Sequence, residues 1–307
     1  MIELPGLARP VAADSLEDVA CGLCGSRERS LHFKDGPFSV VRCSACGLHY
    51  VTPRLKPGAL IESVYDEGYW SSGAAKDRGY TDYRADAPLY LKTYQRRKAV
   101  VKRHFPRPGR VLDVGCAAGY FLSVLQGEGW QVVGYEPSDA IRAQAKERLA
   151  GAPVHGGRLE EAPLEPGSFD LVSFWDVIEH VPDPVATLRH VRSLLKPGGK
   201  LLIETQNIHS RAARWMGKKW QHYKHAEHIY HFDPSTLAQL FERAGFEQLE
   251  NTPALGGKYV SLGFIAERSA RLSPLAAWLC SPLKLLADRS VYINLFDEMI
   301  AVARPKP

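Results

Sequence analysis

Short apolar runs separated by amphipathic stretches dominate the chain from residue 110 onward. The runs at 110–114, 131–135 and 169–174 are rich in Val, Leu and Phe, and none exceeds six residues. Such runs are typical of strands buried on both faces of a parallel sheet. The stretches between them have the length and polarity of helices, which favours right-handed crossovers. The pattern therefore predicts an α/β protein.

A tight turn and an acid follow the first two runs. Gly115 and Gly119 flank the turn, and a helix is expected to begin directly after it, with its first backbone N–H groups unpaired. Glu136 directly follows the second run, about 20 residues after the turn, a spacing at which a carboxylate accepts the hydroxyls of a ribose. Ala117 stands where a dinucleotide site prefers glycine, which argues against a nicotinamide dehydrogenase. The segment therefore predicts a nucleoside site.

The sequence Val-Leu-Asp-Val-Gly-Cys-Ala-Ala-Gly at 111–119 resembles motif I of the class I S-adenosylmethionine methyltransferases. Segments 167–184, 194–207 and 241–246 resemble the corresponding parts of that family, in the same order. The resemblance implies a Rossmann-like, mostly parallel sheet of seven strands with an antiparallel last strand. It also implies that S-adenosyl-L-methionine is the cofactor.

Motif I assigns roles to two acids through the same resemblance. Asp113 would lie near the methionine amino group, and Glu136 would bind the ribose. The other cofactor contacts that the resemblance implies are Gly115, Cys116, Ala117, Gly119, Pro137, Leu159, Trp175, Asp176 and Tyr83.

Two segments carry candidate catalytic residues. Asp176, Glu179 and His180 follow the third predicted strand, and His225 and His228 lie in a histidine-rich stretch farther along. Methyl transfer to a hydroxyl requires a base, and histidine titrates near neutral pH. We expect one of the three histidines to be that base, with Glu179 orienting it, although each could instead be a buried hydrogen-bonding residue. Asp176, Glu179 and His180 with a second histidine could alternatively hold Mg²⁺ or another divalent ion.

Four of the six cysteines form two Cys-x-x-Cys pairs, each followed by glycine and separated by 18 residues. The spacing is typical of a four-thiolate zinc site, and four protein ligands leave no open position for catalysis. Two disulfides or a redox-active pair are the alternatives. The sequence thus predicts a structural Zn²⁺ bound by Cys21, Cys24, Cys43 and Cys46.

Composition and motifs divide the chain into a metal-binding part, a cap and a catalytic domain. The cap would contain aromatic pairs at 65/69 and 80/83, and a helix at 89–104 whose Arg-Arg-Lys run at 96–98 faces solvent. The expected bounds are 1–56 for a loose leader and the zinc ribbon, 57–105 for the helical cofactor cap, and 106–307 for the Rossmann-like domain, with insertions at 208–232 and 256–294.

The chain has 307 residues, 45% of them hydrophobic, and a net charge of +5. Its Lys and Arg residues form no long run, so we expect a small-molecule acceptor and no nucleic acid. No uninterrupted apolar stretch reaches about 18 residues, and the N-terminus lacks a secretory signal pattern, which predicts a cytoplasmic protein. The second insertion is apolar but broken by Pro274 and Pro282. It would either cover the acceptor site or let residues 265–290 touch the inner face of a membrane.

The ribbon, the cap and the histidine-rich stretch together resemble bacterial methyltransferases that act on sugars or secondary metabolites. That resemblance implies transfer to a hydroxyl, or a carbon, of a sugar, glycan or secondary metabolite. A lipid-linked or phenolic, quinone-type acceptor is the alternative. A zinc-ribbon binding protein with a degenerate methyltransferase fold is the second alternative, and the oligomeric state stays open.

Overall fold

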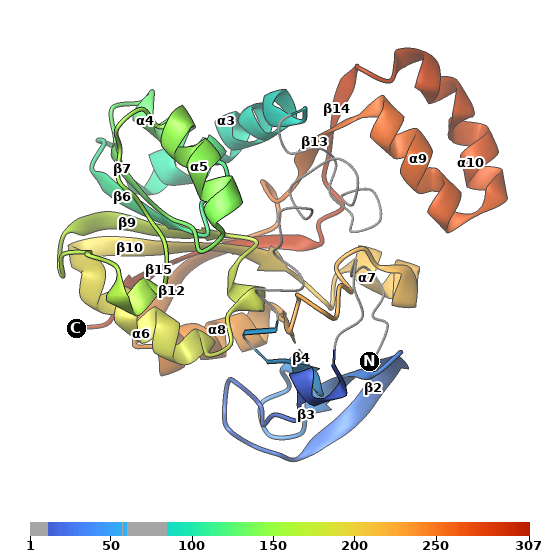
Figure 1. Ribbon diagram of the computed structural model, residues 1–307, viewed down its shortest axis with the longest axis horizontal. Helices are drawn as coiled ribbons and strands as arrows, with labels where there is room; N and C mark the ends of the chain where they lie inside the picture. Colours follow the sequence, from blue (N-terminus) through green and yellow to red (C-terminus); the bar gives the residue numbers. More distant parts are fainter. Residues whose placement is uncertain (1–11, 57, 60–84) are drawn as a thin grey trace.

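The computed structural model describes residues 12–56, 58–59 and 85–307 of the chain (Figure 1). Its centre is a seven-stranded sheet with the order β12-β15-β10-β9-β6-β7-β8. The strands are β6 (Arg110–Val114), β7 (Gln131–Tyr135), β8 (Val154–His155), β9 (Phe169–Trp175), β10 (Leu195–Gln206), β12 (Phe246–Thr252) and β15 (Glu298–Pro305).

Most neighbouring strands of this sheet run parallel, and one strand runs antiparallel to both of its neighbours. β6 pairs in parallel with β7 and β9, and β10 pairs in parallel with β9. β15 inserts antiparallel between β10 and β12. The predicted mostly parallel sheet with an antiparallel last strand is therefore confirmed.

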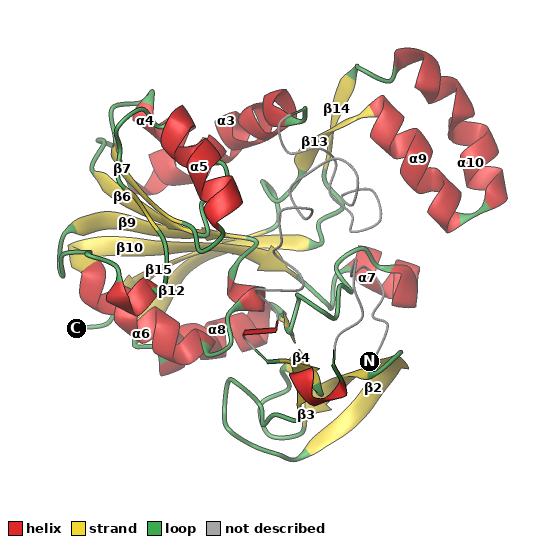
Figure 2. Cartoon of the chain, in the orientation of Figure 1, coloured by secondary structure: helices red, strands yellow, loops and turns green. Residues whose placement is uncertain are grey.

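Helices cover both faces of the sheet (Figure 2). One face carries α3 (Ala87–His104), α4 (Tyr120–Gln126) and α5 (Asp139–Arg148), and the other carries α6 (Pro184–Leu194) and α8 (Pro234–Arg243). Alternate strand residues point to opposite faces of the sheet. Leu171 therefore packs in the buried core under α3 and α4, and Val172 packs in the buried core under α6 and α8. Burial on both faces explains why these strands read as continuous apolar runs.

Arg97 of α3 contradicts the expectation that its basic run faces solvent. The residue is only 4% exposed, and its guanidinium donates to carboxylates of Glu204 on β10 (2.6 Å) and Glu298 on β15 (3.2 Å). The prediction was wrong because the pattern on the helix gave no sign of the two acids, which come from strands far along the chain.

The N-terminal cysteine segment forms a second sheet with the order β11-β4-β3-β2. Its strands are β2 (Arg29–Asp35), β3 (Phe38–Cys43), β4 (His49–Val51) and β11 (Tyr230–His231). β11 comes from the first predicted insertion, so the ribbon sheet is completed by the catalytic part of the chain. In addition, β1 (Leu16–Glu17) pairs with β5 (Arg54–Leu55), so the end of the expected loose leader is ordered by strand pairing.

The second insertion forms an arm at one side of the molecule (Figure 1). Strands β13 (Lys258–Ser261) and β14 (Ser290–Ile293) pair and carry α9 (Leu262–Leu272), α10 (Pro274–Cys280) and the 3-10 helix η6 (Ser281–Leu286). Within the described ranges, no helix is both long and apolar enough to cross a membrane. The cytoplasmic location stays a prediction.

The remaining short elements are η1 (Ala13–Ser15), η3 (Leu159–Glu161), η4 (Ile178–His180), α7 (Arg211–Met216) and η5 (Gly217–Lys219).

Candidate active site

The turn between β6 and α4 lies at the carboxyl edge of the parallel strands. Gly115 and Gly119 have φ angles of +75° and +77°, which favour glycine. A Cβ added at Gly115 would lie 2.5 Å from a methyl carbon of Val177, so the position also has no room for a side chain. The Gly115 amide donates to the carbonyl of Tyr135, which ties the turn to the end of β7.

Two buried acids stand beside this turn. The Glu136 carboxylate accepts from the backbone N–H groups of Ala117 (3.0 Å) and Ser138 (2.9 Å), and burial raises its pKa to about 7. Asp113 accepts from the Ser173 hydroxyl at 2.6 Å, and burial raises its pKa to about 8. The structure thus brings both predicted acids to the glycine turn.

The other predicted cofactor contacts differ in burial and in their position in the fold. Cys116 and Leu159 are buried, whereas Pro137 is exposed. Trp175 ends β9, and its ring packs against Phe121, with ring centroids 4.8 Å apart. Asp176 follows with a φ of 54°, a backbone conformation that turns the chain sharply at the sheet edge. Tyr83 lies outside the described residues, as do the aromatic pairs at 65/69 and 80/83.

Two of the predicted catalytic histidines, His180 and His228, lie in contact close to the end of β9. The rings of His180 in η4 and His228 pack edge to face, with their centroids 4.7 Å apart. Burial lowers the pKa of His180 and lowers that of His228 further. Both imidazoles are therefore expected to be neutral at neutral pH, the form that can accept a proton.

Glu179 lies beside the histidine pair. It is completely buried, accepts from the Thr205 hydroxyl at 3.0 Å, and its pKa is raised well above the ordinary value by burial. One ligand atom each from Glu179, His180 and His228 lie within 4.8 Å of one another. The same three side chains could therefore bind a divalent ion, with His228 as the second histidine that the sequence left unnamed.

His225, the third predicted base, lies elsewhere. Its Nε2 is 3.3 Å from the Asp35 carboxylate, and its ring contacts Phe33, so both neighbours belong to β2 of the ribbon. His231 is completely buried next to it, and neither of its ring nitrogens has a hydrogen-bond partner among the described residues. The structure thus separates His225 from the other two candidates, and the site assignments stay predictions.

Sequence reasoning missed a buried charge network behind Trp175. Arg97 binds Glu204 and Glu298, and the Lys258 amine binds Glu298 at 2.7 Å. The Arg97 guanidinium also lies 5.4 Å from the Trp175 ring centre. One signal could have revealed the network, because Glu204 interrupts an apolar strand that is buried on both faces, and a buried carboxylate needs a partner.

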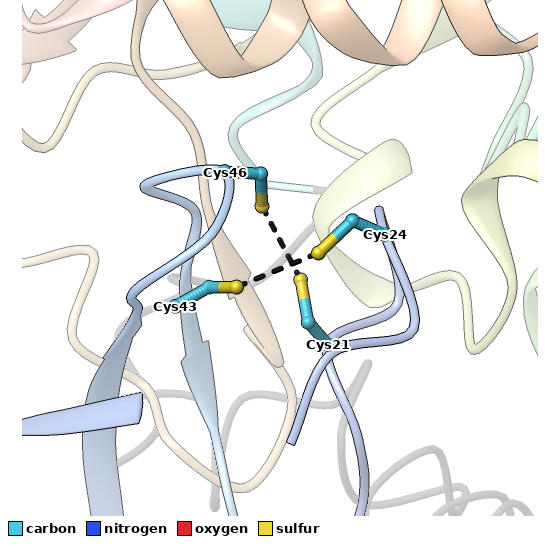
Figure 3. A group of neighbouring side chains, drawn as sticks. All are labelled: Cys21, Cys24, Cys43 and Cys46. Carbon is cyan, nitrogen blue, oxygen red and sulfur yellow. Dashed lines mark hydrogen bonds between the residues drawn. The ribbon is translucent and has the colours of Figure 1, made fainter. Parts of the chain in front are cut away.

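The four predicted zinc ligands converge on one point (Figure 3). Their sulfur atoms lie within 4.8 Å of one another, with 3.5 Å separating Cys21 from Cys46 and Cys24 from Cys43. Tetrahedral zinc with Zn–S bonds of about 2.3 Å requires sulfur atoms about 3.8 Å apart, so the arrangement fits the ion. The hydrogen bond between Cys21 and Cys46 lowers the pKa of the Cys21 thiol and raises that of the Cys46 thiol. All six cysteines are free, which disfavours the disulfide alternative.

Comparison with known proteins identifies the fold and the chemistry. A family model for a methyltransferase domain matches residues 83–251. The ubiquinone biosynthesis O-methyltransferase of Xanthomonas axonopodis pv. citri is 33% identical over 184 residues, 55% of this chain and 74% of the relative. The enzyme of the same name from Sodalis glossinidius is 36% identical over 107 residues, 33% of this chain and 43% of the relative.

A solved structure shows the same fold. One chain of the complex between the Haloferax volcanii Trm112 methyltransferase activator and a methyltransferase covers 73% of this chain and 95% of its own length. Its sequence identity is 18% and its TM-score is 0.52. The family match and the observed sheet confirm the prediction made from motif I: the chain belongs to the class I S-adenosylmethionine-dependent methyltransferases.

Proposed function

We propose that this methyltransferase moves the methyl group to a hydroxyl oxygen of a small phenolic acceptor. The observation that carries the proposal is the edge-to-face contact of the half-buried His180 with the buried His228, just after the end of β9. Such a pair can take the hydroxyl proton, and a positioned base contributes about 10²–10⁴-fold to a rate. Relatives named for O-methylation in ubiquinone biosynthesis support a phenolic acceptor over the expected sugar or glycan.

The side chains at the sheet edge divide the work. Glu136 accepts the ribose hydroxyls, and Asp113 faces the methionine amino group. Trp175 closes the site on the side of α3 and keeps water out, which holds donor and acceptor in a reactive alignment. S-adenosylmethionine supplies a methyl group on an already activated sulfonium, so the remaining task for the protein is to receive the acceptor proton at a ring nitrogen of His180 or His228.

A screen with labelled donor tests this proposal. The acceptors are 3,4-dihydroxybenzoate as a catechol and a nucleotide-linked sugar as the competing class. His228→Asn should lower kcat on the catechol about 10²-fold or more, with donor affinity unchanged. His190→Asn is the matched control, because His190 lies on α6 outside the site. Methylation of the sugar alone, or full activity of His228→Asn, would contradict the proposal.

A bound divalent ion is a second way to activate the hydroxyl, favoured by the Glu179–His180–His228 geometry. An ion would lower the pKa of a hydroxyl that binds to it. Activity that disappears with EDTA and returns with Mg²⁺ or Mn²⁺ would favour the ion. Activity indifferent to EDTA would favour the imidazole pair acting without an ion.

We also propose that Cys21, Cys24, Cys43 and Cys46 bind one structural Zn²⁺. The convergence of four sulfur atoms and the absence of disulfides support this assignment. Elemental analysis of the purified protein should find about one zinc per chain, as expected for a closed four-thiolate site. Cys24→Ser should abolish it, and zinc that stays bound in that variant would contradict the assignment.

The apolar arm supports contact with a lipid surface. Five large apolar side chains of α10 and η6 are each more than half exposed: Leu275, Trp278, Leu279, Leu285 and Leu286. The basic residues Lys284 and Arg289 and one acid, Asp288, lie exposed beside them, and this excess of positive charge suits an anionic bilayer. Co-sedimentation with phosphatidylglycerol vesicles should be lost in Trp278→Ala and kept in Trp215→Ala, whose tryptophan is exposed on α7. Equal vesicle binding by the two variants would contradict this contact.

A further inference from the structure

One short strand connects the cysteine ribbon to the catalytic histidine pair. β11 begins two residues after His228 and pairs antiparallel with β4 of the ribbon, with Tyr230 opposite Tyr50 and His231 opposite His49. The partners are about 180 residues apart in sequence but adjacent in the second sheet. The ribbon therefore reaches the loop on which His228 lies.

Ile229, the residue directly after His228, is held from both sides. Its backbone N–H donates to the carbonyl of Glu179 at 3.0 Å, and its carbonyl accepts from the N–H of Val51 at 2.9 Å. The first bond fixes the loop to η4, where His180 lies, and the second fixes it to the ribbon. The N–H also donates to the carbonyl of Glu227 at 3.1 Å, so it keeps a partner if the bond to Glu179 is lost. Because Ile229 is buried, loss of the bond from Val51 would take a hydrogen-bond donor from a carbonyl that water does not reach.

Tyr230 continues the connection with its backbone and its side chain. Its carbonyl accepts from the Gln206 amide at 3.0 Å. Its hydroxyl donates to the carbonyl of Pro182 at 2.9 Å and accepts from the Arg54 guanidinium at 3.2 Å. The Tyr230 side chain therefore joins the ribbon, through Arg54, to the segment that follows η4.

The Tyr230 ring also packs directly on the first cysteine knuckle. A Cβ added at Gly22, which lies between Cys21 and Cys24, would be 2.0 Å from the Tyr230 hydroxyl oxygen. On the second knuckle, the carbonyl of Cys46 accepts from the Gln239 amide of α8 at 3.1 Å. Both knuckles of the metal site are thus in contact with the methyltransferase domain.

We propose that the zinc ribbon positions His228 against His180, and so forms one wall of the acceptor site. Ile229 and Tyr230 are positioning residues in this arrangement, because they act through the neighbouring His228. Without β4 and the Gly22 knuckle, the loop would lose its bonds to Val51 and Arg54, and the His180–His228 contact would no longer be fixed. The assignment of this contact to the acceptor site rests on the proposed function.

Gly22→Ala tests the connection without changing a cysteine. The φ angle of Gly22 lies outside the left-handed region, so alanine is compatible with the backbone and its methyl group collides only with Tyr230. The matched control is Arg27→Ala, which changes an exposed side chain of the same ribbon. Four properties are measured in both variants: zinc content, affinity for S-adenosylhomocysteine, hydrogen exchange at Ile229, and the imidazole NMR signals of His180 and His228.

Gly22→Ala should keep its zinc and its cofactor affinity. The Ile229 amide should exchange about tenfold faster or more, the two imidazole signals should shift, and kcat on the catechol probe should fall about tenfold with little change in thermal midpoint. Arg27→Ala should match wild type in every property. Unchanged Ile229 exchange and unchanged imidazole signals in Gly22→Ala would overturn the proposal.

Removal of zinc from the wild-type chain provides a second test that needs no variant. After chelation, the amides of Val51 and Ile229 should lose protection while those of β6 keep it. If Ile229 stays protected in the zinc-free protein, the ribbon does not position the loop. Neither exchange nor imidazole signals require an acceptor, so a shift in both without methylation of any probe would reject only the proposed function.

Discussion

Raising the pH should tighten the binding of S-adenosylhomocysteine because it ionises Glu136, a buried carboxyl group beside the glycine turn. Its pKa is raised to about 7 because it is buried. In the complex it would accept hydrogen bonds from the two ribose hydroxyls, and such bonds favour the ionised form. Cofactor binding below that pKa must therefore release a proton.

The size of the effect follows from the raised pKa. One pH unit below the pKa, about a tenth of the carboxyl groups are ionised, so ionisation costs about 1.4 kcal/mol and weakens binding about tenfold. One unit above the pKa, this cost is nearly absent. The Glu136 contribution alone should therefore raise the affinity about tenfold from about pH 6 to about pH 8. The stability of the free protein changes with pH in the opposite direction. The folded state holds this proton more tightly than the unfolded state, so the free energy of unfolding falls as the pH rises from the ordinary pKa of 4.5 to the raised pKa of about 7.

Titration calorimetry over this pH range, in two buffers of different ionisation enthalpy, measures both the affinity and the released proton. Glu136→Gln should bind more weakly at high pH, by about 1–3 kcal/mol, and should show a flatter pH profile. Asp113→Asn is the necessary comparison, since the pKa of Asp113 is raised to about 8 and its titration adds a step at higher pH. Measured in the Asp113→Asn background, which removes that step, the added Glu136→Gln should remove the rise; if the double variant keeps the full rise between about pH 6 and about pH 8, another group titrates and the ribose assignment is wrong.

Three further predictions concern stability and metal removal. Arg97→Ala leaves Glu204 and Glu298 buried without their guanidinium, so urea unfolding should show a loss of about 3–5 kcal/mol, against little change for the exposed Arg107→Ala. Asp233→Ala removes the side chain that accepts from the N–H groups of Ser235 and Thr236 at the start of α8, and thermal unfolding should report a loss of about 1 kcal/mol. A loss as large as that of Arg97→Ala would show that Asp233 does more than cap the helix. Chelation of zinc should leave calorimetric binding of S-adenosylhomocysteine intact, because β6 and β7 lie outside the ribbon sheet. Loss of cofactor binding on chelation would place the ribbon in the cofactor site as well.

The sequence was informative where local pattern decides structure. The strand, glycine turn and helix at 110–126 depend on neighbouring residues alone, and the acid at position 136 follows from the length of one β–α–β unit. The four cysteines were equally readable, because Cys-x-x-Cys spacing already places two sulfur atoms on one side of a turn. Each of these features needs only short-range geometry.

Contacts between residues far apart in the sequence could not be predicted from local patterns. β11 has two residues, too few for any alternation, and its partner β4 lies in another predicted part of the chain. The meeting of His228 with His180, and the distance of His225 from both, follow from that pairing. The burial of Arg97 was missed for the same reason, since a helix pattern shows which side chains are polar but not which acids of distant strands lie next to them.

Burial keeps the charge of the candidate site low. It raises the pKa of Asp113, Glu136 and Glu179 and lowers that of His228, so each group is driven towards its neutral form. A cationic ligand with hydroxyl and amino donors favours the ionised carboxylates again, because it replaces the missing solvent with opposite charge and hydrogen bonds. The neutral imidazoles nearby keep their capacity for a proton. On the proposed assignment, the same desolvation would prepare the acids to bind the donor and the histidines to act as bases.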